Sequence, residues 1–158
     1  MSDPGTLYRR YAPDVFRFAL YLSGDRDEAE DITSETFVRA WTSPEPIRAA
    51  TVKGYLFTIA RNLFLQALRK RRRQVGLEGV EMQDPAPGPH AQAEQSSEVE
   101  AALAALQKFS EVDRAALLMR AVHDMPYEEI ARSLGISLAA TRVRIHRARL
   151  ALLRQRET

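Results

Sequence analysis

The sequence predicts an all-α protein of two small helical domains, because apolar residues recur at helical spacing on both sides of one acidic, proline-bearing segment. No stretch alternates apolar and polar residues over a useful length, so no strand is expected. Residues 75–97 contain three of the eight prolines, and proline cannot continue a helix or a central strand. We therefore expect domains at residues 1–74 and 98–158, held apart by a flexible linker at 75–97. A surface loop inside one domain is the alternative.

The composition narrows the class of protein. Hydrophobic residues make up 45% and charged residues 28% of the 158 residues, which is typical of a soluble globular chain. Cysteine is absent, which excludes a disulfide framework, a thiolate metal site and a cysteine nucleophile. No apolar run approaches the roughly 18 residues that a membrane helix needs, and the N-terminal residues lack the pattern of an export signal. These observations favour a cytoplasmic protein that does not insert into a membrane.

The net charge of +2 conceals an uneven distribution. Residues 1–74 carry 13 Lys and Arg against 9 Asp and Glu, whereas residues 75–97 carry four acidic residues and no basic one. Residues 98–158 carry ten basic residues, and six of them lie between Ser137 and Arg156. Such alternation is expected when basic surfaces meet nucleic acid. For any single basic cluster, the alternative is a helix face that contacts only solvent.

Three helices are expected in the first domain. Apolar residues from Leu7 to Leu22 are spaced three or four apart and so share one face of a helix. Asp25 is a suitable N-cap for a second helix, whose first turns are acidic as the helix dipole favours. The residues of this helix that we expect to face inward are Ala29, Ile32, Thr36 or Phe37, Ala40 and Trp41. After a proline-bearing loop, residues 53–73 form a third helix.

Five consecutive basic residues, at positions 69–73, end this third helix. Alone they are weak evidence of function, since cations at a helix C-terminus stabilise the helix anyway. Tyr55, Phe57 and Phe64 precede them, and aromatic rings beside a positive groove suit the stacking of unpaired bases. Aromatic residues at helical spacing are also typical of a core, and we expect Phe57 or Phe64, or both, to be buried.

The most specific pattern lies in the second domain, at residues 126–153. Two helices precede it, and we expect Asp113 to cap the second of them. Pro126 can then start a short helix, Gly135 can end it in the left-handed conformation, and Ser137 can cap the next helix. A short helix, a glycine-bearing turn and a second helix form a helix-turn-helix. Neither half of the chain is expected to bury much core alone, because small helical domains are marginally stable.

The second helix of this motif is basic on its outer side. Its predicted inward stripe consists of Leu138, Thr141, Ile145, Ala148 and Leu152. Its predicted outward stripes consist of Arg142, His146 and Arg149, and of Arg144 and Arg147. In a helix-turn-helix the second helix enters the major groove, where arginine binds guanine bidentately or clamps phosphates. We interpret this helix as a DNA reader. A basic amphipathic helix that faces solvent or a partner protein is the alternative.

These patterns resemble those of the extracytoplasmic-function sigma factors of the sigma-70 family. The first domain of that family commonly reads AEDxxxETFxxAW and then YLxxIARN; here Ala29–Trp41 reads AEDITSETFVRAW and Tyr55–Asn62 reads YLFTIARN. The second commonly reads SYEEIAxxLGIS and then GTVKSRLHRAR; here Pro126–Ser137 reads PYEEIARSLGIS and Ala139–Arg149 reads AATRVRIHRAR. The resemblance covers about residues 5–155, in the family's order.

The resemblance implies a promoter-recognition subunit that works when bound to core RNA polymerase, without a cofactor or a metal. It assigns polymerase binding to Asp31, Glu35 and Arg39. It assigns opening of the −10 element, with capture of flipped-out bases, to Tyr55, Asn62, Arg61, Arg69 and Arg72. It assigns the −35 element to Arg142, Val143, His146 and Arg147 as base readers, with Arg144 and Arg149 on the backbone. It also implies that the linker threads through the polymerase, that an anti-sigma factor is a partner, and that the free chain is a monomer.

Departures from the family pattern affect promoter recognition. Ala140 lacks the usual hydroxyl, and Val143 replaces a polar reader with a side chain that could contact a thymine methyl group. Gln66 stands where an aspartate is usual, and residues 43–52 lack the common aromatic residue of this loop. No promoter sequence can therefore be carried over from the family.

Three rival functions fit the sequence less well. A sigma-like decoy would bind an anti-sigma protein without touching DNA, but the arginines retained on both domains argue against it. A stand-alone helix-turn-helix regulator would bind duplex DNA without polymerase, as a dimer. An enzyme is the least supported, since His90, His123 and His146 form no H-x-x-x-H pair and no glycine-rich phosphate loop is present.

Overall fold

The computed structural model describes residues 3–43, 51–76 and 97–157, and within these ranges the chain forms helices and no strand. The all-α prediction is therefore confirmed. Among the helices described, none combines the length and the apolar character needed to cross a bilayer. Most of the predicted linker, residues 77–96, lies outside the described residues, and so does most of the loop that precedes the third helix.

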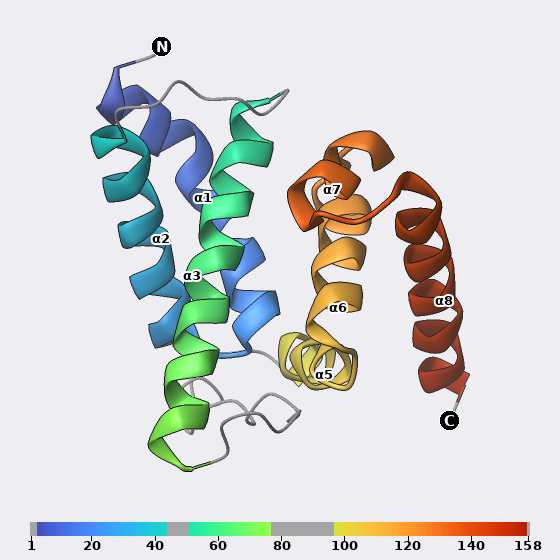
Figure 1. Cartoon of the computed structure of the whole chain (residues 1–158). Coiled ribbons are helices and arrows are strands. Elements are labelled where there is room, and N and C mark those ends of the chain that lie inside the picture. The colour runs from blue at the N-terminus through green and yellow to red at the C-terminus, as the bar shows by residue number, and fades with distance from the viewer. Residues whose placement is uncertain (1–2, 44–50, 77–96, 158) are drawn as a thin grey trace.

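The first module contains α1 (Pro4–Ser23), α2 (Arg26–Thr42) and α3 (Val52–Gln74), which pack side by side (Figure 1). A tight turn joins α1 to α2: Gly24 has a left-handed φ of 72°, and its N–H donates to the Leu20 carbonyl at 2.7 Å. Asp25 then accepts a hydrogen bond from the Glu28 N–H at 3.2 Å. The predicted N-cap of the second helix is confirmed.

The core of the first module follows the predicted periodicity with one exception. Phe57 and Phe64 are both fully buried, as predicted. Trp41 was expected to face inward but is 42% exposed. It directly follows the buried Ala40 in the last turn of α2, so it lies on the flank of the buried stripe, where its ring packs at 6.2 Å from that of Phe37.

The second module contains α5 (Ser97–Leu106), α6 (Glu111–Leu117), η1 (Leu118–Val122), α7 (Tyr127–Leu134) and α8 (Leu138–Glu157). Asp113 was expected to cap the second of these helices, and this prediction is wrong. Ser110 is the N-cap, because its backbone is extended and its hydroxyl accepts from the Asp113 N–H at 3.3 Å. The wider π-helical turns of η1 continue α6, with the His123 N–H donating to the Leu118 carbonyl at 3.2 Å.

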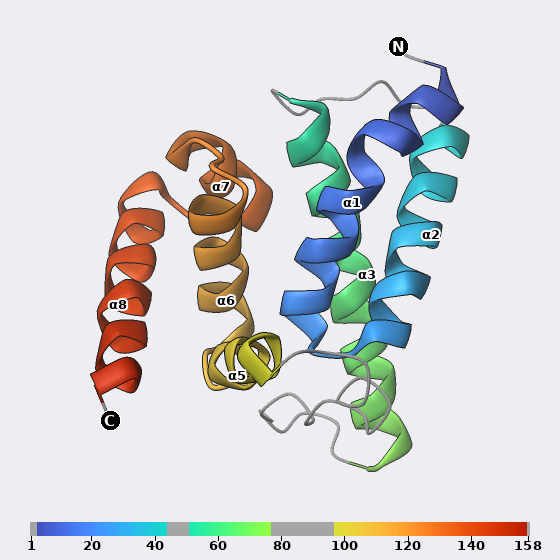
Figure 2. The same ribbon diagram turned by 180° about the vertical axis from the view of Figure 1, so that it is seen from behind.

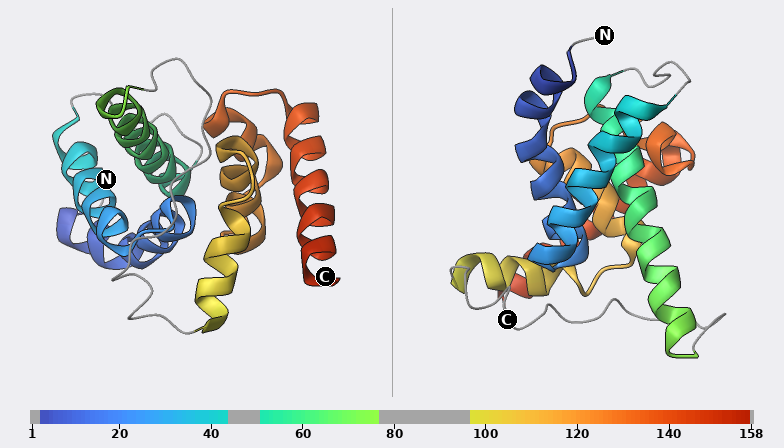
Figure 3. Two further views of the ribbon diagram at one scale, coloured as in Figure 1. Left: turned by 90° about the horizontal axis from the view of Figure 1, so that it is seen from below. Right: turned by 90° about the vertical axis from the view of Figure 1, so that its left-hand side faces the viewer.

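The two modules pack directly against each other, so the expectation that they are held apart is wrong for this structure. Figures 1 and 2 show α6 and α7 beside the first module and α8 on the far side of them. The helix α5 crosses one end of the molecule at a steep angle to α3 (Figure 3). Buried apolar residues of both modules form one continuous cluster. We call the surface between the modules the joint, and its residues come from α1 and α3 on one side and from residues 106–133 on the other.

A buried arginine lies at the joint. Arg114 is fully buried, and its guanidinium donates to the Leu106 carbonyl at 3.0 Å, to the Phe109 carbonyl at 3.1 Å and to the Leu22 carbonyl of α1. Arg114 thereby supplies donors to carbonyls at the ends of two helices and ties the two modules together. A buried cation with so many acceptors is costly to disturb, because its removal leaves polar atoms without partners.

A carboxylate of the second module lies at the N-terminus of α3. Glu129 is only 4% exposed, and its Oε1 accepts hydrogen bonds from Thr51 N at 3.3 Å and from Thr51 Oγ1 at 3.2 Å. The helix dipole favours a negative charge at this position. Gly54 makes the approach possible, since a β-carbon at Gly54 would lie 1.9 Å from Glu129 Oε1. Nearby, Thr58 Oγ1 and Ser133 Oγ form a second link at 2.7 Å.

Candidate nucleic-acid interface

The turn between α7 and α8 has the geometry of a helix-turn-helix. Pro126 occupies the N-cap of α7, and Gly135 ends that helix with a left-handed φ of 70°. The Ile136 N–H donates to the Ala131 carbonyl at 3.1 Å. Ser137 Oγ then accepts from the Ala140 N–H at 3.0 Å and caps α8. The motif predicted at residues 126–153 is therefore confirmed in its turn and in both caps.

The buried stripe of α8 fixes which residues face outward. Thr141, Ile145 and Ala148 are buried, and Leu152 is half-buried against the same core. The Thr141 hydroxyl donates to the Ser137 carbonyl at 2.9 Å, so this buried polar atom has a partner. These contacts prevent α8 from rotating about its axis, and the opposite face is left open to solvent.

The exposed residues of α8 include all four predicted base readers. Arg142, Val143, His146 and Arg147 are all exposed on the helix that lies farthest from the first module (Figure 1). The guanidinium of Arg142 lies 5.7 Å from the centre of the Tyr127 ring of α7. The attraction between the Tyr127 ring and the Arg142 guanidinium restricts the motion of this side chain. The donors of Arg142 are therefore held at one edge of α8.

The two predicted backbone contacts lie on the flanks of this face. Arg144 is half-buried and donates to Asp113 Oδ1 of α6 at 2.9 Å. Arg149 is exposed and borders an apolar groove of about 390 Å³ between α5, η1 and α8. The structure therefore brings the four predicted base readers together and separates the two predicted phosphate contacts onto opposite edges.

The predicted −10 residues lie on two sides of α3. Tyr55, Asn62 and Arg69 are seven residues apart and so share one face, on which Asn62 and Arg69 are exposed and Tyr55 is half-buried. Arg61 and Arg72 lie on a neighbouring face and are half-buried. Residues 44–50, which would form the other wall of the predicted pocket, lie outside the described residues.

Arg61 points into the joint and is paired there with Glu111 of α6. Its Nε donates to Glu111 Oε2 at 2.6 Å and its Nη2 donates to Oε1 at 2.8 Å, and each side chain is only 12% exposed. This bidentate arrangement is among the strong forms of ion pair in proteins. In the docked arrangement the guanidinium of Arg61 is therefore occupied, and it is not presented to DNA.

The predicted polymerase-binding residues form an exposed row on α2. Asp31, Glu35 and Arg39 are spaced four apart, and Arg39 Nε donates to Glu35 Oε1 at 3.2 Å. A hollow of about 450 Å³ lies beside this row, between α2 and α3. Its acidic lining residues are Asp25, Asp27, Glu28, Asp31 and Glu35. This face repels phosphates and suits a basic protein surface.

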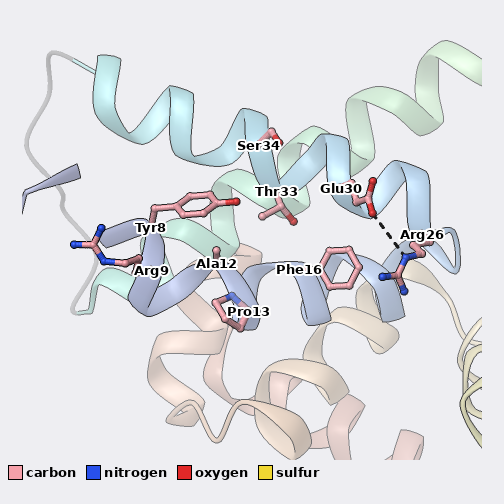
Figure 4. A pocket seen from close by; sticks show the side chains of 9 residues that line it. All are labelled: Tyr8, Arg9, Ala12, Pro13, Phe16, Arg26, Glu30, Thr33 and Ser34. Carbon is pink, nitrogen blue, oxygen red and sulfur yellow. Dashed lines mark ion pairs between the residues drawn. The ribbon is translucent and has the colours of Figure 1, made fainter. Parts of the chain in front are cut away.

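A larger hollow of about 610 Å³ lies between α1 and α2 (Figure 4). Tyr8 and Phe16 supply its aromatic surface. The Arg26 guanidinium lies 5.6 Å from the centre of the Phe16 ring and its Nε lies 3.7 Å from Glu30 Oε1. Arg9 also lines this hollow and donates to the Thr6 hydroxyl at 3.3 Å, so two cations and one carboxylate face the space.

His123 is a further buried group that the sequence patterns did not identify. It follows η1 in the second module and is 6% exposed, in contact with rings of the first module. Burial lowers the pKa of His123 to about 4, an effect that Lys53 and Arg17 reinforce and Asp14 opposes. The imidazole is therefore neutral at physiological pH.

Comparison with known proteins places these features in a family. Residues 7–74 match the family described as sigma-70 region 2, and residues 100–152 match the one described as sigma-70 region 4. The chain is 38% identical over 148 residues to the ECF RNA polymerase sigma factor SigE of Mycolicibacterium smegmatis, covering 90% of this chain and 57% of the relative. It is 33% identical to the ECF RNA polymerase sigma factor EcfG of Rhodopseudomonas palustris, covering 87% of this chain and 76% of the relative.

A solved structure agrees with these matches. The sigma factor RpoE of Bartonella quintana, solved in complex with the anti-sigma factor NepR, superimposes with a TM-score of 0.76 at 28% identity, covering 96% of this chain and 94% of that one. The paired regions and the relatives together show that the chain belongs to the ECF sigma factors of the sigma-70 family. The resemblance read from the sequence motifs is confirmed.

Proposed function

We propose that this chain directs core RNA polymerase to promoters and starts transcription there, acting as a non-catalytic subunit in the cytoplasm. The observation that carries the proposal is the exposed basic face of α8 on a helix-turn-helix whose turn and caps are well formed. This face occurs in a chain that matches sigma-70 regions 2 and 4 in that order. The chain spans 57% of SigE and 76% of EcfG, so the proposal concerns what these two regions do.

The proposed reading of the −35 element rests on chemistry available at the outer face of α8. Arg142 and Arg147 supply forked donors that match guanine edges, and Val143 supplies an apolar surface for a thymine methyl group. Arg144 and Arg149, at the two edges, are positioned to meet phosphates on either side of a groove. Arg144 can do so only if it exchanges Asp113 for a phosphate.

The proposed opening of the −10 element rests on the outer face of α3. Asn62 offers donors and an acceptor for a base edge, Tyr55 offers a ring for stacking, and Arg69 offers a cation for the backbone. Arg61 and Arg72 complete the predicted set. Of these, Arg61 needs the joint to separate before it is available, because it is bound to Glu111.

The proposed binding of polymerase rests on the row Asp31, Glu35 and Arg39 and on the acidic hollow beside it. The structural relative was solved with an anti-sigma factor, and we propose that a protein of that class also binds this chain. The free chain is proposed to be a monomer, since one continuous core already joins its two modules.

The proposal is tested by transcription from a library of promoter sequences with core polymerase, with and without the purified chain. We expect transcripts from a subset of sequences only when the chain is present, weak binding to duplex DNA without polymerase, and the mass of a monomer by light scattering. A dimer that shifts duplex DNA without polymerase would favour a stand-alone regulator. No transcript from any sequence, with tight binding to an anti-sigma protein, would favour a decoy.

A further inference from the structure

A histidine of the second module is inserted between aromatic rings of the first. Phe18 of α1 and Phe57 of α3 stack with centroids 4.6 Å apart and planes 6° apart. The His123 ring meets both edge-on, with its centroid 4.5 Å from that of Phe57 and 6.0 Å from that of Phe18. All three side chains are buried. Separation of the modules would expose the two phenyl rings and the imidazole together.

The site of this imidazole suits its neutral form. Its Nε2 is buried and has no hydrogen-bond partner among the residues that the structure describes. The charged groups that face it are Asp14 and Arg17 of α1 and Lys53 of α3. Asp14 Oδ2 already lies 3.6 Å from Lys53 Nζ, so it is not free to balance a new positive charge.

The chain beside His123 offers no better counter-charge. Asp124 Oδ1 lies 3.6 Å from Arg120 Nη1 and is almost wholly exposed to solvent. A proton on the His123 ring would therefore place a cation in an apolar joint, near one paired carboxylate and two further cations. Such a charge is much better accommodated in water than in the joint.

We propose that the joint is a proton-sensitive clasp: it holds the two modules together while His123 is neutral and opens when His123 is protonated. Opening separates Arg61 from Glu111 and frees its guanidinium. This last step, the release of Arg61 toward promoter DNA, rests on the proposed function, whereas the opening itself does not.

The direction of the pH response follows from proton linkage. In the docked state the pKa of His123 is lowered to about 4, and in an opened state the exposed ring returns toward its ordinary value of 6.5. Between these values the opened state binds a proton that the docked state does not, so a falling pH favours opening. The equilibrium constant for opening should rise about tenfold between pH 7.5 and pH 5.5.

Single-molecule energy transfer can measure opening directly, because the chain has no cysteine of its own. Ser34→Cys on α2 and Arg154→Cys on α8 place one dye on an exposed position of each module. We expect the opened fraction to rise as the pH falls from 7.5 to 5.5, with an unchanged helical circular dichroism signal that excludes unfolding. No polymerase or DNA is needed, so this result is independent of whether the chain directs transcription.

Two replacements of His123 test its role, with a second histidine as control. His123→Phe keeps an aromatic ring in the joint, and His123→Gln keeps a neutral polar group if the first variant folds poorly; either should abolish the rise. His146→Gln removes an exposed histidine of α8 and should preserve it. A rise of equal size in the His123 variants would overturn the proposal. So would a joint that tightens in acid, as a dominant cation–π attraction between His123 and Phe57 would produce.

Discussion

Arg61 and Glu111 form a two-bonded ion pair across the joint, with Nε–Oε2 and Nη2–Oε1 distances of 2.6 and 2.8 Å. One partner belongs to the predicted −10 set and the other begins α6 of the second module. The pair therefore links a residue of the predicted −10 set to the second module. Opening of the joint would therefore expose the guanidinium of Arg61.

Removing one partner of this pair should weaken the docked arrangement. Glu111→Gln leaves the nearly buried Arg61 without its counter-charge, and we expect the free energy of unfolding to fall by about 1–3 kcal/mol. Urea denaturation followed by circular dichroism measures the change. The matched control is Glu35→Gln, which breaks the exposed pair with Arg39 and should cost at most about 1 kcal/mol. Equal losses of unfolding free energy in the two variants would show that the Arg61–Glu111 pair stabilises the protein no more than an exposed ion pair does.

Gly54 should not tolerate a side chain. A β-carbon there would overlap Glu129 Oε1, so Gly54→Ala should displace α7 and destabilise the docked arrangement by about 1–3 kcal/mol. Gly5→Ala, in the first turn of α1, would place its β-carbon 3.2 Å from Asp3 Oδ2 and 3.3 Å from Arg9 Nη1, so only small side-chain shifts are needed and the change should cost much less. Thermal unfolding of both variants gives the comparison.

A second substitution can relieve the Gly54 clash. Combining Gly54→Ala with Glu129→Ala removes the carboxylate that the new β-carbon would meet, although it also removes the hydrogen bonds from Thr51. We expect the double variant to be more stable than the sum of the two single losses. Strict additivity would mean that Gly54 and Glu129 do not interact.

The helices and their caps could be predicted from the sequence because they depend on residues that are close together in the chain. Asp25, Gly135 and Ser137 cap their helices as their residue types require, and helical spacing predicted burial of Phe57 and Phe64. Ser110 was missed because Asp113, three residues later, is also a good capping residue, and only the backbone conformation distinguishes them.

The docking of the modules could not be predicted in the same way. Glu129 occurs in the first turn of α7, where a carboxylate is expected for local reasons, and nothing in its spacing shows that it faces Thr51. His123 likewise belongs to no motif. Each half is small enough that it was expected to need further burial of apolar surface. The continuous apolar cluster formed by the two modules provides that burial.

Arg114 should be the most sensitive polar residue of the joint. Arg114→Leu keeps an apolar stem but removes the donors to the Leu106, Phe109 and Leu22 carbonyls. Because a buried acceptor without a partner costs about 1–3 kcal/mol, the total loss should reach at least about 3 kcal/mol. Arg154→Leu, at an exposed position of α8, is the control and should change stability little. A loss below that of Glu111→Gln, measured by urea denaturation, would contradict this account.

Arg142 and Arg147 should determine which bases are recognised, whereas Arg149 should contribute affinity without base preference. If each forks onto a base, replacement by alanine should lower transcription from a cognate promoter about 5- to 150-fold, the equivalent of about 1–3 kcal/mol. It should also relax the base preference at one position of the −35 element.

Arg149→Ala, if that residue contacts only phosphate, should weaken binding to all sequences alike and reduce the salt dependence by about one released ion. The control is Arg10→Ala, on the exposed side of α1, which should change neither transcription nor salt dependence. Because α8 is anchored by Thr141, Ile145 and Ala148 on its opposite side, these substitutions should leave the unfolding temperature unchanged. Unaltered base preference in both Arg142→Ala and Arg147→Ala would place the reading surface elsewhere on the molecule.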